Sequence, residues 1–298
     1  MRPEVLSRKQ HKEAKYFNMN YLLLVFSCLC NGMKSVFAKK SNAYLNEKHN
    51  IYTYNFYMFF IAFLIALFVS ISNLNIVSIQ TIVMAVFYGL FLVFGQVFLI
   101  KAMDVGEVSV STLFYSCGFL IPSFVSVFVY DEKLKLLQVV GIVLILVSFV
   151  ISVEKFQKGK RIWFIFAVLS FLCNGMVGLM QKIFRMSNFG SEQNVFMVIA
   201  FFVGAVITFF IMPKKVKELP AKGFFKTVLG SGMMLGLVHV INVDVSGVLP
   251  GIIVFPSVNG GGIIVSAILA RIFVKEKISF RKKAGIIIGV IAICLIAI

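Results

Sequence analysis

A chain of 298 residues, of which 60% are apolar and only 14% charged, has too little polar surface to cover a soluble globule. Its net charge of +17 would suggest nucleic-acid binding in a soluble protein. Here the basic residues lie in loops and a tail beside apolar segments, where anionic lipid and the positive-inside rule explain them. Composition therefore excludes a soluble domain, argues against a nucleic-acid partner and indicates a protein that lies in the lipid bilayer.

Ten apolar segments follow one another along the chain, each long enough to cross a hydrocarbon core of about 30 Å as a helix. The predicted spans are 20–38, 54–72, 79–102, 108–130, 135–153, 162–184, 194–212, 224–243, 247–274 and 281–298. They do not alternate apolar and polar residues as the strands of a membrane barrel do. We therefore predict an all-α integral membrane protein with ten transmembrane helices.

The segment before the first span, residues 1–19, is a basic N-terminal tail. Its apolar residues show no regular spacing and its charges cannot be buried, so we predict that this tail is disordered. No small-residue cleavage site follows the first apolar run, so this run is predicted to be a retained helix.

The five cysteines, Cys28, Cys30, Cys117, Cys173 and Cys294, all fall inside predicted spans. A disulfide framework or a zinc site would require cysteines near water and near one another. We interpret them as small apolar packing residues and expect no metal site.

The sequence "LCNGM" occurs at residues 29–33 and again at 172–176. The ends of the two halves also align, because "EKLKLLQVVGI" begins at Glu132 and "EKISFRKKAGI" begins at Glu276. The chain is thus predicted to consist of two five-helix repeats, residues 20–153 and 162–298, joined by a linker at 154–161. Because each repeat crosses the membrane an odd number of times, the second repeat is inverted relative to the first.

This pattern resembles the drug/metabolite transporter superfamily, and specifically its EamA-type branch. The residues that carry the resemblance are the Glu-bearing loops "DEKL" and "KEKI", each followed by an apolar last helix that opens with a Gly nine residues after the Glu. The resemblance implies a multi-pass protein of the cytoplasmic membrane that carries amino acids, other metabolites or xenobiotics, commonly as an exporter, through a central cavity. It implies no catalytic residue and no cofactor.

Two arguments about membrane orientation disagree. Nine Lys and Arg residues lie on the side of the tail, nineteen lie on the opposite side, and Lys34 lies within a helix. The positive-inside rule would place the nineteen in the cytoplasm and both termini outside. The arrangement implied by the resemblance has both termini inside. The count of Lys and Arg favours the orientation with both termini outside, because the excess of basic residues on the opposite side is spread over three short loops.

Lys34 is the most informative polar residue inside a predicted span, because an intramembrane charge is costly and is usually retained for function. It lies three residues after Asn31, on the same helical face, and the matching position of the second half is Val177. One interpretation is a cation that holds a substrate carboxylate or phosphate in the cavity. The alternative is a Lys that extends to the membrane interface beside Lys39 and Lys40.

Asn31 and Asn174 could line the cavity, or they could form hydrogen bonds between helices beside Gly32 and Gly175. His239 could titrate near neutrality and couple transport to protons, although a single His near a helix end is more often a packing residue. The complete predicted substrate site consists of Asn31, Lys34, Tyr88, Gln96, Tyr115, Asn174, Gln181, His239 and Asn259.

The sequence contains no Walker motif, which argues against ATP as the energy source. Scattered histidines and the lack of a clustered nucleophile and base argue against an intramembrane enzyme. We therefore predict a secondary transporter for a small polar metabolite such as an amino acid or other carboxylate, with no coupling ion assigned. The alternatives are a drug efflux transporter and a non-transporting membrane scaffold.

Overall fold

The computed structural model describes residues 3–41, 44, 51–71, 77–105, 108–152, 161–212, 222–273 and 279–298. These residues form helices and turns and no strand. The α-helices are α1 (Pro3–Ser41), α2 (Ile51–Ser70), α3 (Ile79–Val105), α4 (Val108–Ser116), α5 (Leu120–Val129), α6 (Leu136–Ser152), α7 (Arg161–Met186), α8 (Gln193–Ile211), α9 (Lys222–Ser246), α10 (Gly251–Phe273) and α11 (Phe280–Ala297). The chain also contains the short 3-10 helices η3 (Cys117–Phe119) and η4 (Gly190–Glu192).

Eight helical segments of the described residues are long and apolar enough to cross a membrane. The predicted spans 135–153 and 281–298 correspond to α6, which has only 17 residues, and to α11, whose first turn carries Arg281, Lys282 and Lys283. The structure therefore confirms a multi-pass helical membrane protein, while the number of ten crossings stays a prediction.

The expectation of a disordered N-terminal tail is wrong, because α1 runs without a break from Pro3 to Ser41. The sequence between Glu4 and Met19 contains neither Gly nor Pro and is rich in Glu, Lys, Gln, Leu and Ala, which favour helix. A helix that is already nucleated in the first span can therefore extend backwards through these residues.

The fourth predicted span, 108–130, is a helix interrupted in its middle by η3. Pro122 has no N–H to donate to the carbonyl of Gly118, so a regular helical bond is lost there. Gly118 also lies directly against α7, since a Cβ at this position would lie 2.8 Å from the carbonyl oxygen of Phe171. The interruption therefore coincides with a close approach of two helix backbones.

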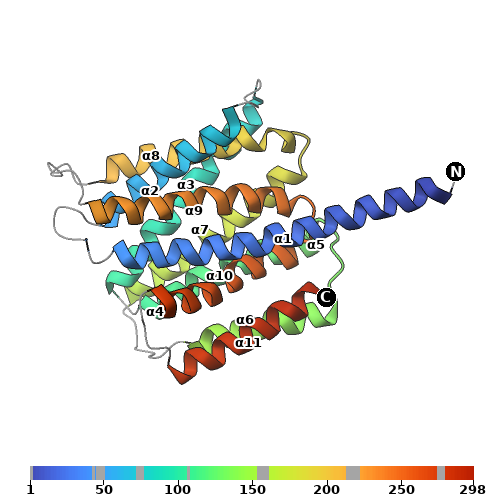
Figure 1. Ribbon diagram of the computed structural model, residues 1–298. Helices are drawn as coiled ribbons and strands as arrows, with labels where there is room; N and C mark the ends of the chain where they lie inside the picture. Colours follow the sequence, from blue (N-terminus) through green and yellow to red (C-terminus); the bar gives the residue numbers. More distant parts are fainter. Residues whose placement is uncertain are drawn as a thin grey trace.

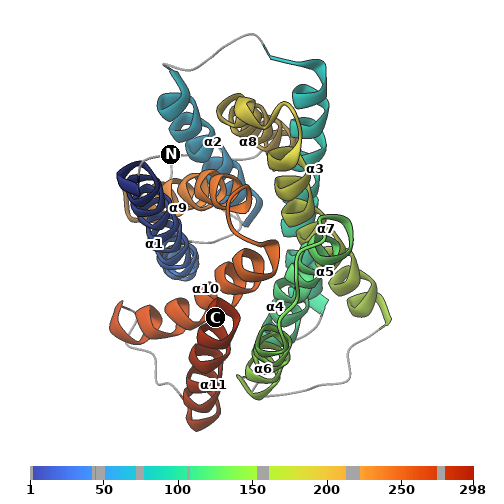
Figure 2. The ribbon, with the colours of Figure 1, turned by 90° about the vertical axis from the view of Figure 1, so that its right-hand side faces the viewer.

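The helices pack in a consistent pattern across the bundle (Figures 1 and 2). α1 packs against α9 and α10, whereas α7 packs against α3 and against the interrupted span formed by α4, η3 and α5. α2 contacts α8 and α9, and α3 contacts α8. α6 and α11 pack mainly against each other, and this pair lies at one edge of the molecule beside α10.

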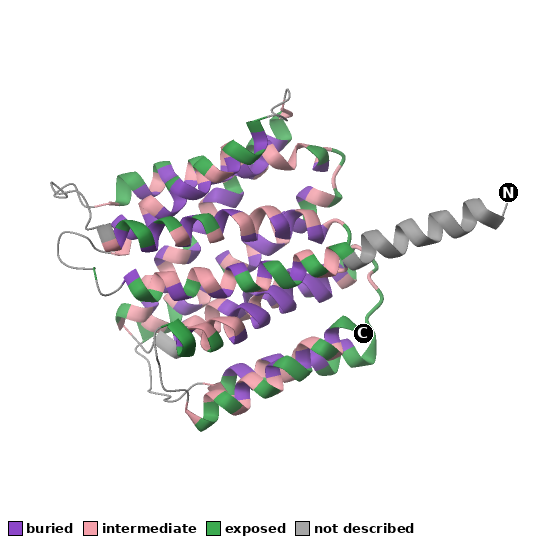
Figure 3. Cartoon of the chain, in the orientation of Figure 1, coloured by how far each residue is buried: buried purple, intermediate pink, exposed green. Residues whose placement is uncertain are grey.

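Exposed residues lie along the outer faces of the helices (Figure 3), and many of them are large and apolar. Phe59, Phe196 and Phe201 are fully buried, whereas Phe128 is 79% exposed and Phe210 is 76% exposed. A soluble protein would not expose so many large apolar groups, but hydrocarbon solvates them without cost. The exposed apolar faces therefore identify the surface that contacts lipid.

A buried ion pair joins three segments at the end of the bundle where the C-terminus lies. Oε1 of Glu132, in the turn after α5, lies 2.8 Å from the ammonium nitrogen of Lys182 in α7. The same carboxylate accepts hydrogen bonds from the backbone N–H groups of Gly251 (3.1 Å) and Ile252 (3.5 Å), the first residues of α10. Negative charge is favourable at a helix N-terminus, so Glu132 caps α10.

In these contacts Glu132 caps a helix and pairs a loop with the bundle interior. The nine basic residues placed on the tail side in the orientation count include Lys182, but Lys182 lies inside α7 and is 3% exposed. Its ammonium also donates to the carbonyl of Ser246 at 3.0 Å. The matching Glu276 lies outside the described residues.

Candidate functional site

Three of the predicted site residues form one hydrogen-bonded cluster in the interior of the bundle. Tyr88 of α3, Gln181 of α7 and His239 of α9 lie several residues from the ends of their helices. The Tyr88 hydroxyl lies 2.6 Å from Nδ1 of His239, and Nε2 of Gln181 donates to the same hydroxyl at 2.7 Å. Tyr88 and Gln181 are buried and His239 is half-buried. The sequence identified all three residues, and the structure brings them together from three helices.

The His239 ring is held by contacts on several sides. Its Nδ1 lies 2.6 Å from the Tyr88 hydroxyl and 3.2 Å from Nε2 of Gln181. Edge-on contacts with Tyr88 (ring centroids 6.0 Å apart) and Phe201 (5.9 Å) hold the ring in place.

Lys34 of α1 is half-buried beside this cluster, and its charge interacts with His239. Its ammonium makes no hydrogen bond or ion pair to a residue in the described ranges. The backbone carbonyl of Lys34 accepts from the hydroxyl of Ser231 in α9 at 3.2 Å, and Ser231 also bonds to Tyr54 of α2. The backbone around Lys34 is thus fixed to α9, while its charged group stays available to a ligand.

A second group of predicted residues gathers at Tyr115 in α4. Nε2 of Gln96 donates to the Tyr115 hydroxyl at 3.1 Å, and Nδ2 of Asn174 donates to the Tyr115 carbonyl at 2.8 Å. Tyr115 also lies within electrostatic range of Tyr88. Gln96, Tyr115 and Asn174 are half-buried, so this group continues the polar interior from the first cluster towards α4.

The two remaining predicted residues lie at a different interface. Nδ2 of Asn31 donates to the carbonyl of Val258 in α10 at 3.1 Å. Asn259 donates to the carbonyl of Phe255 in its own helix, at 3.0 Å. Asn31 lies where α1 meets α10, and both side chains donate to backbone carbonyls of α10, so these bonds do not join them to the cluster around Tyr88.

The glycine run "NGGG" at 259–262 lies in the unbroken helix α10. A Cβ at Gly261 would lie 2.8 Å from Sγ of Cys28, and one at Gly262 would lie 2.4 Å from Nδ2 of Asn31. Close packing against α1 therefore explains Gly261 and Gly262.

Polar contacts between helices also include residues that the predicted site omitted. The hydroxyl of Ser27 in α1 donates to Oδ1 of Asn242 in α9 at 2.6 Å, and both side chains are buried. Ser231 was missed because a serine in an apolar helix gives no distinctive signal in sequence. Its bond to the buried Tyr54 shows how α2 and α9 are joined next to Lys34.

The five cysteines are free, and the described residues contain no group of three His, Cys, Asp or Glu side chains that could hold a metal ion. None of the nine predicted site residues lines the cavity of about 250 Å³ between α1, α6, α10 and α11.

Comparison with known proteins identifies the family. Residues 18–153 match the model of the EamA-like transporter family. No curated protein matches the sequence. Twenty-eight chains of solved structures match. One of them, a protein known from its crystal structure, superposes with a TM-score of 0.72 over 94% of this chain and 98% of its own length. At 13% identity this likeness shows the fold alone. Residues 18–153 are therefore an EamA-like domain, of the drug/metabolite transporter superfamily, within a chain that is a multi-pass membrane protein.

Proposed function

We propose that this protein is a secondary transporter of the cell membrane that exports a small polar metabolite, such as an amino acid or other carboxylate. The observation that carries the proposal is the position of Lys34 beside the Tyr88, Gln181 and His239 cluster, inside the bundle. Four helices, α1, α3, α7 and α9, contribute these side chains. A substrate bound there would contact both halves of the chain.

The charge of Lys34 favours a substrate that carries an anionic group. A lysine inside a membrane protein costs several kcal/mol unless water or an opposite charge compensates it. No described acidic side chain pairs with Lys34, so a substrate carboxylate would supply the missing charge. The neighbouring Tyr and Gln side chains provide hydrogen bonds for the rest of a small polar molecule.

Alternating access between two inverted repeats, residues 20–153 and 162–298, is the proposed mechanism. The helix contacts support it, because main pairings recur with the two halves exchanged. The pairing of α1 with α9 corresponds to that of α7 with α3, and the pairing of α2 with α9 corresponds to that of α8 with α3. Such repeated contacts let one half rock against the other around a shared site. Export is the direction that the family resemblance favours.

The test is a thermal-stability screen of the detergent-purified protein against amino acids, organic acids, nucleosides and cationic drugs. It compares the wild type with Lys34→Met and with Lys40→Met. Lys40 is a matched control because it lies in the last turn of the same helix, with its ammonium 5.3 Å from the ring of Phe273. A ligand at about 100 times its dissociation constant stabilises the folded state by roughly 2.7 kcal/mol, which gives a measurable shift.

We expect a carboxylate to stabilise the wild type and Lys40→Met but not Lys34→Met. Transport of that ligand into proteoliposomes should then be lost in Lys34→Met alone. Equal ligand-induced shifts of the melting temperature in all three proteins would refute the proposed role of Lys34 in substrate binding. Stabilisation by cationic drugs only would replace metabolite export with drug efflux.

A further inference from the structure

The sequence "GSG" at residues 230–232 of α9 forms a junction at which three helices meet. A Cβ at Gly230 would lie 2.7 Å from the ring of Phe37 in α1. A Cβ at Gly232 would lie 2.7 Å from Cβ of Ile61 and 2.8 Å from the carbonyl oxygen of Met58, both in α2. Small residues let helices in a membrane protein approach closely, so these two glycines bring α1 and α2 close to α9.

Ser231, between the two glycines, connects both neighbouring helices through its hydroxyl. It donates to the backbone carbonyl of Lys34 in α1 at 3.2 Å, and it accepts from the hydroxyl of Tyr54 in α2. Ser231 is fully buried and Tyr54 is 2% exposed. Water therefore does not replace these bonds, and removing either hydroxyl leaves a buried polar group without its partner.

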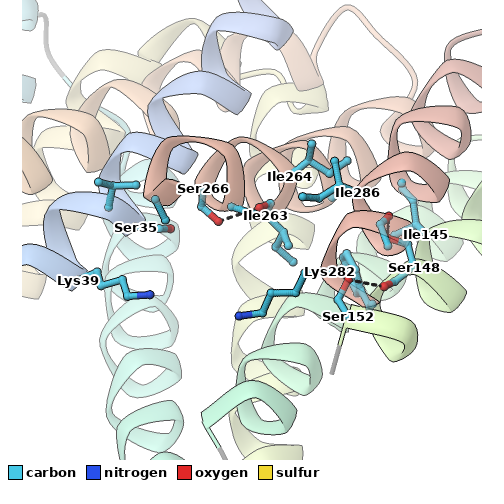
Figure 4. Close-up of a pocket in the computed structure, with 17 residues that line it drawn as sticks. Ser35, Lys39, Ile145, Ser148, Ser152, Ile263, Ile264, Ser266, Lys282 and Ile286 are labelled. Carbon is cyan, nitrogen blue, oxygen red and sulfur yellow. Dashed lines mark hydrogen bonds between the residues drawn. The ribbon is translucent and has the colours of Figure 1, made fainter. Parts of the chain in front are cut away.

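The same part of α1 also borders an unfilled space. Ser35, the residue after Lys34, lines the cavity between α1, α6, α10 and α11, and so does Val36 (Figure 4). Close packing fixes the position of a helix, and the cavity removes part of that packing from α1 at this level. The bond from Ser231 therefore has a large share in fixing the backbone of Lys34.

α9 also carries a ring that senses the charge of Lys34. His239 lies eight residues after Ser231 in the same helix, and the charge of Lys34 acts on it. One helix thus fixes the backbone of Lys34 and places His239 near its charged group. A shift of α1 relative to α9 would change where this ammonium stands relative to the cluster of Tyr88, Gln181 and His239.

We propose that Ser231 and Tyr54 are positioning residues for Lys34. Ser231 fixes the Lys34 carbonyl, Tyr54 orients the Ser231 hydroxyl, and together they set the place of the ammonium that binds a substrate carboxylate. This inference rests on the proposed function of Lys34. Because both residues act through Lys34, their replacement should change substrate affinity only while Lys34 is present.

The experiment measures dissociation constants from ligand-induced shifts of the melting temperature of the full-length, detergent-purified protein. The probes are succinate, glutamate and leucine, each of which carries a carboxylate. Ser231→Ala and Tyr54→Phe are each made in the wild type and in Lys34→Met, which gives two double-mutant cycles. Tyr54→Phe also serves as the second variant if Ser231→Ala does not fold.

Ser27→Ala is the matched control. The hydroxyl of Ser27 in α1 also bonds to α9, at the buried Asn242 (2.6 Å), and Ser27 lies about two turns before Lys34. This variant therefore removes a buried hydrogen bond between the same two helices without touching the Lys34 carbonyl.

We expect Ser231→Ala and Tyr54→Phe to weaken binding of the tightest carboxylate probe about fivefold, which is the effect of one lost hydrogen bond. In Lys34→Met the same substitutions should leave any remaining affinity unchanged. Ser27→Ala should lower the melting temperature of the free protein but leave the affinity unchanged. If Lys34→Met binds none of the probes, the comparison of Ser231→Ala with Ser27→Ala decides alone.

Two results would overturn the positioning role and leave the proposed function intact. The first is equal weakening in Ser231→Ala and Ser27→Ala, because any lost bond between α1 and α9 would then lower the affinity. The second is an unchanged affinity in Ser231→Ala and Tyr54→Phe while Lys34→Met loses binding. A wild type that binds no carboxylate, or an affinity unchanged in Lys34→Met, would instead overturn the proposed function and this inference with it.

Discussion

Asn31 and Asn174 make the same bond in the two halves of the chain. Asn31 donates to the carbonyl of Val258, and Asn174 donates to the carbonyl of Tyr115. The two asparagines are 143 positions apart, and the same 143 positions separate Tyr115 from Val258. The repeated "LCNGM" thus encodes one contact twice, in which an amide joins the first helix of one half to the fourth span of the other.

The first prediction concerns this pair. Asn31→Ala and Asn174→Ala should each lower the free energy of unfolding by about 1 kcal/mol, because each leaves a backbone carbonyl without its interhelical donor. Asn259→Ala removes a hydrogen bond within a single helix, so it should lower the free energy of unfolding by a smaller amount. Thermal unfolding of the purified variants in one detergent measures the three effects, and a larger loss for Asn259→Ala than for the other two would contradict the assignment.

The second prediction uses two glycines in helical segments with different surroundings. A Cβ at Gly118 would lie 2.8 Å from the backbone oxygen of Phe171 and 2.9 Å from the backbone nitrogen of Gly175, whereas one at Gly236 would have no such neighbour closer than 3.5 Å. Gly118→Ala should therefore destabilise the protein by about 1–3 kcal/mol, since backbone atoms must move.

Gly236→Ala is the control for this substitution. Alanine favours helix over glycine by about 0.5–1 kcal/mol, and the site has room for the methyl group, so this variant should be neutral or slightly more stable. Equal melting temperatures for the two variants would show that η3 and α7 are not in close contact at Gly118.

The third prediction concerns the ion pair between Glu132 and Lys182, whose side chains are 12% and 4% exposed. Glu132→Gln and Lys182→Met should each lower stability by about 3 kcal/mol, because each leaves an uncompensated charge in a buried position. The double variant leaves neither charge and should lose less than the sum of the two. Additive losses in this double-mutant cycle would mean that the two groups do not interact.

The fourth prediction concerns orientation. The excess of Lys and Arg on the side opposite the termini predicts that this side faces the cytoplasm. A reporter fused after Ile298 should then behave as extracellular. A fluorescent protein that matures and emits in the cytoplasm from this position would reverse the orientation.

The apolar pattern alone was enough to predict the class of fold and the positions of the helices, because a membrane requires long apolar segments. It could not predict the interruption at Cys117–Phe119, which depends on how closely Gly118 approaches α7. The prediction of a disordered tail was also wrong, because a segment whose apolar residues show no regular spacing can still be helical when it continues an existing helix.

The residues of the candidate site could be predicted from the sequence, but the contacts among them could not. Tyr88, Gln181 and His239 are conspicuous as polar residues in apolar segments, so the sequence identified them. Their mutual contacts depend on the packing of α3, α7 and α9, which a single sequence does not specify. Lys182 was placed incorrectly because a lysine near the end of a span resembles a loop residue until its partner Glu132 is located.

The ion pair of Glu132 and Lys182 ties three helical segments together at one end of the bundle, while the cavity beside Lys39 opens at the other. Lys39 is the residue 143 positions before Lys182. Under the proposed rocking of the two halves, this contact would have to separate. Because a buried ion pair is costly to separate, such a cycle would be slow and strongly temperature-dependent at this step.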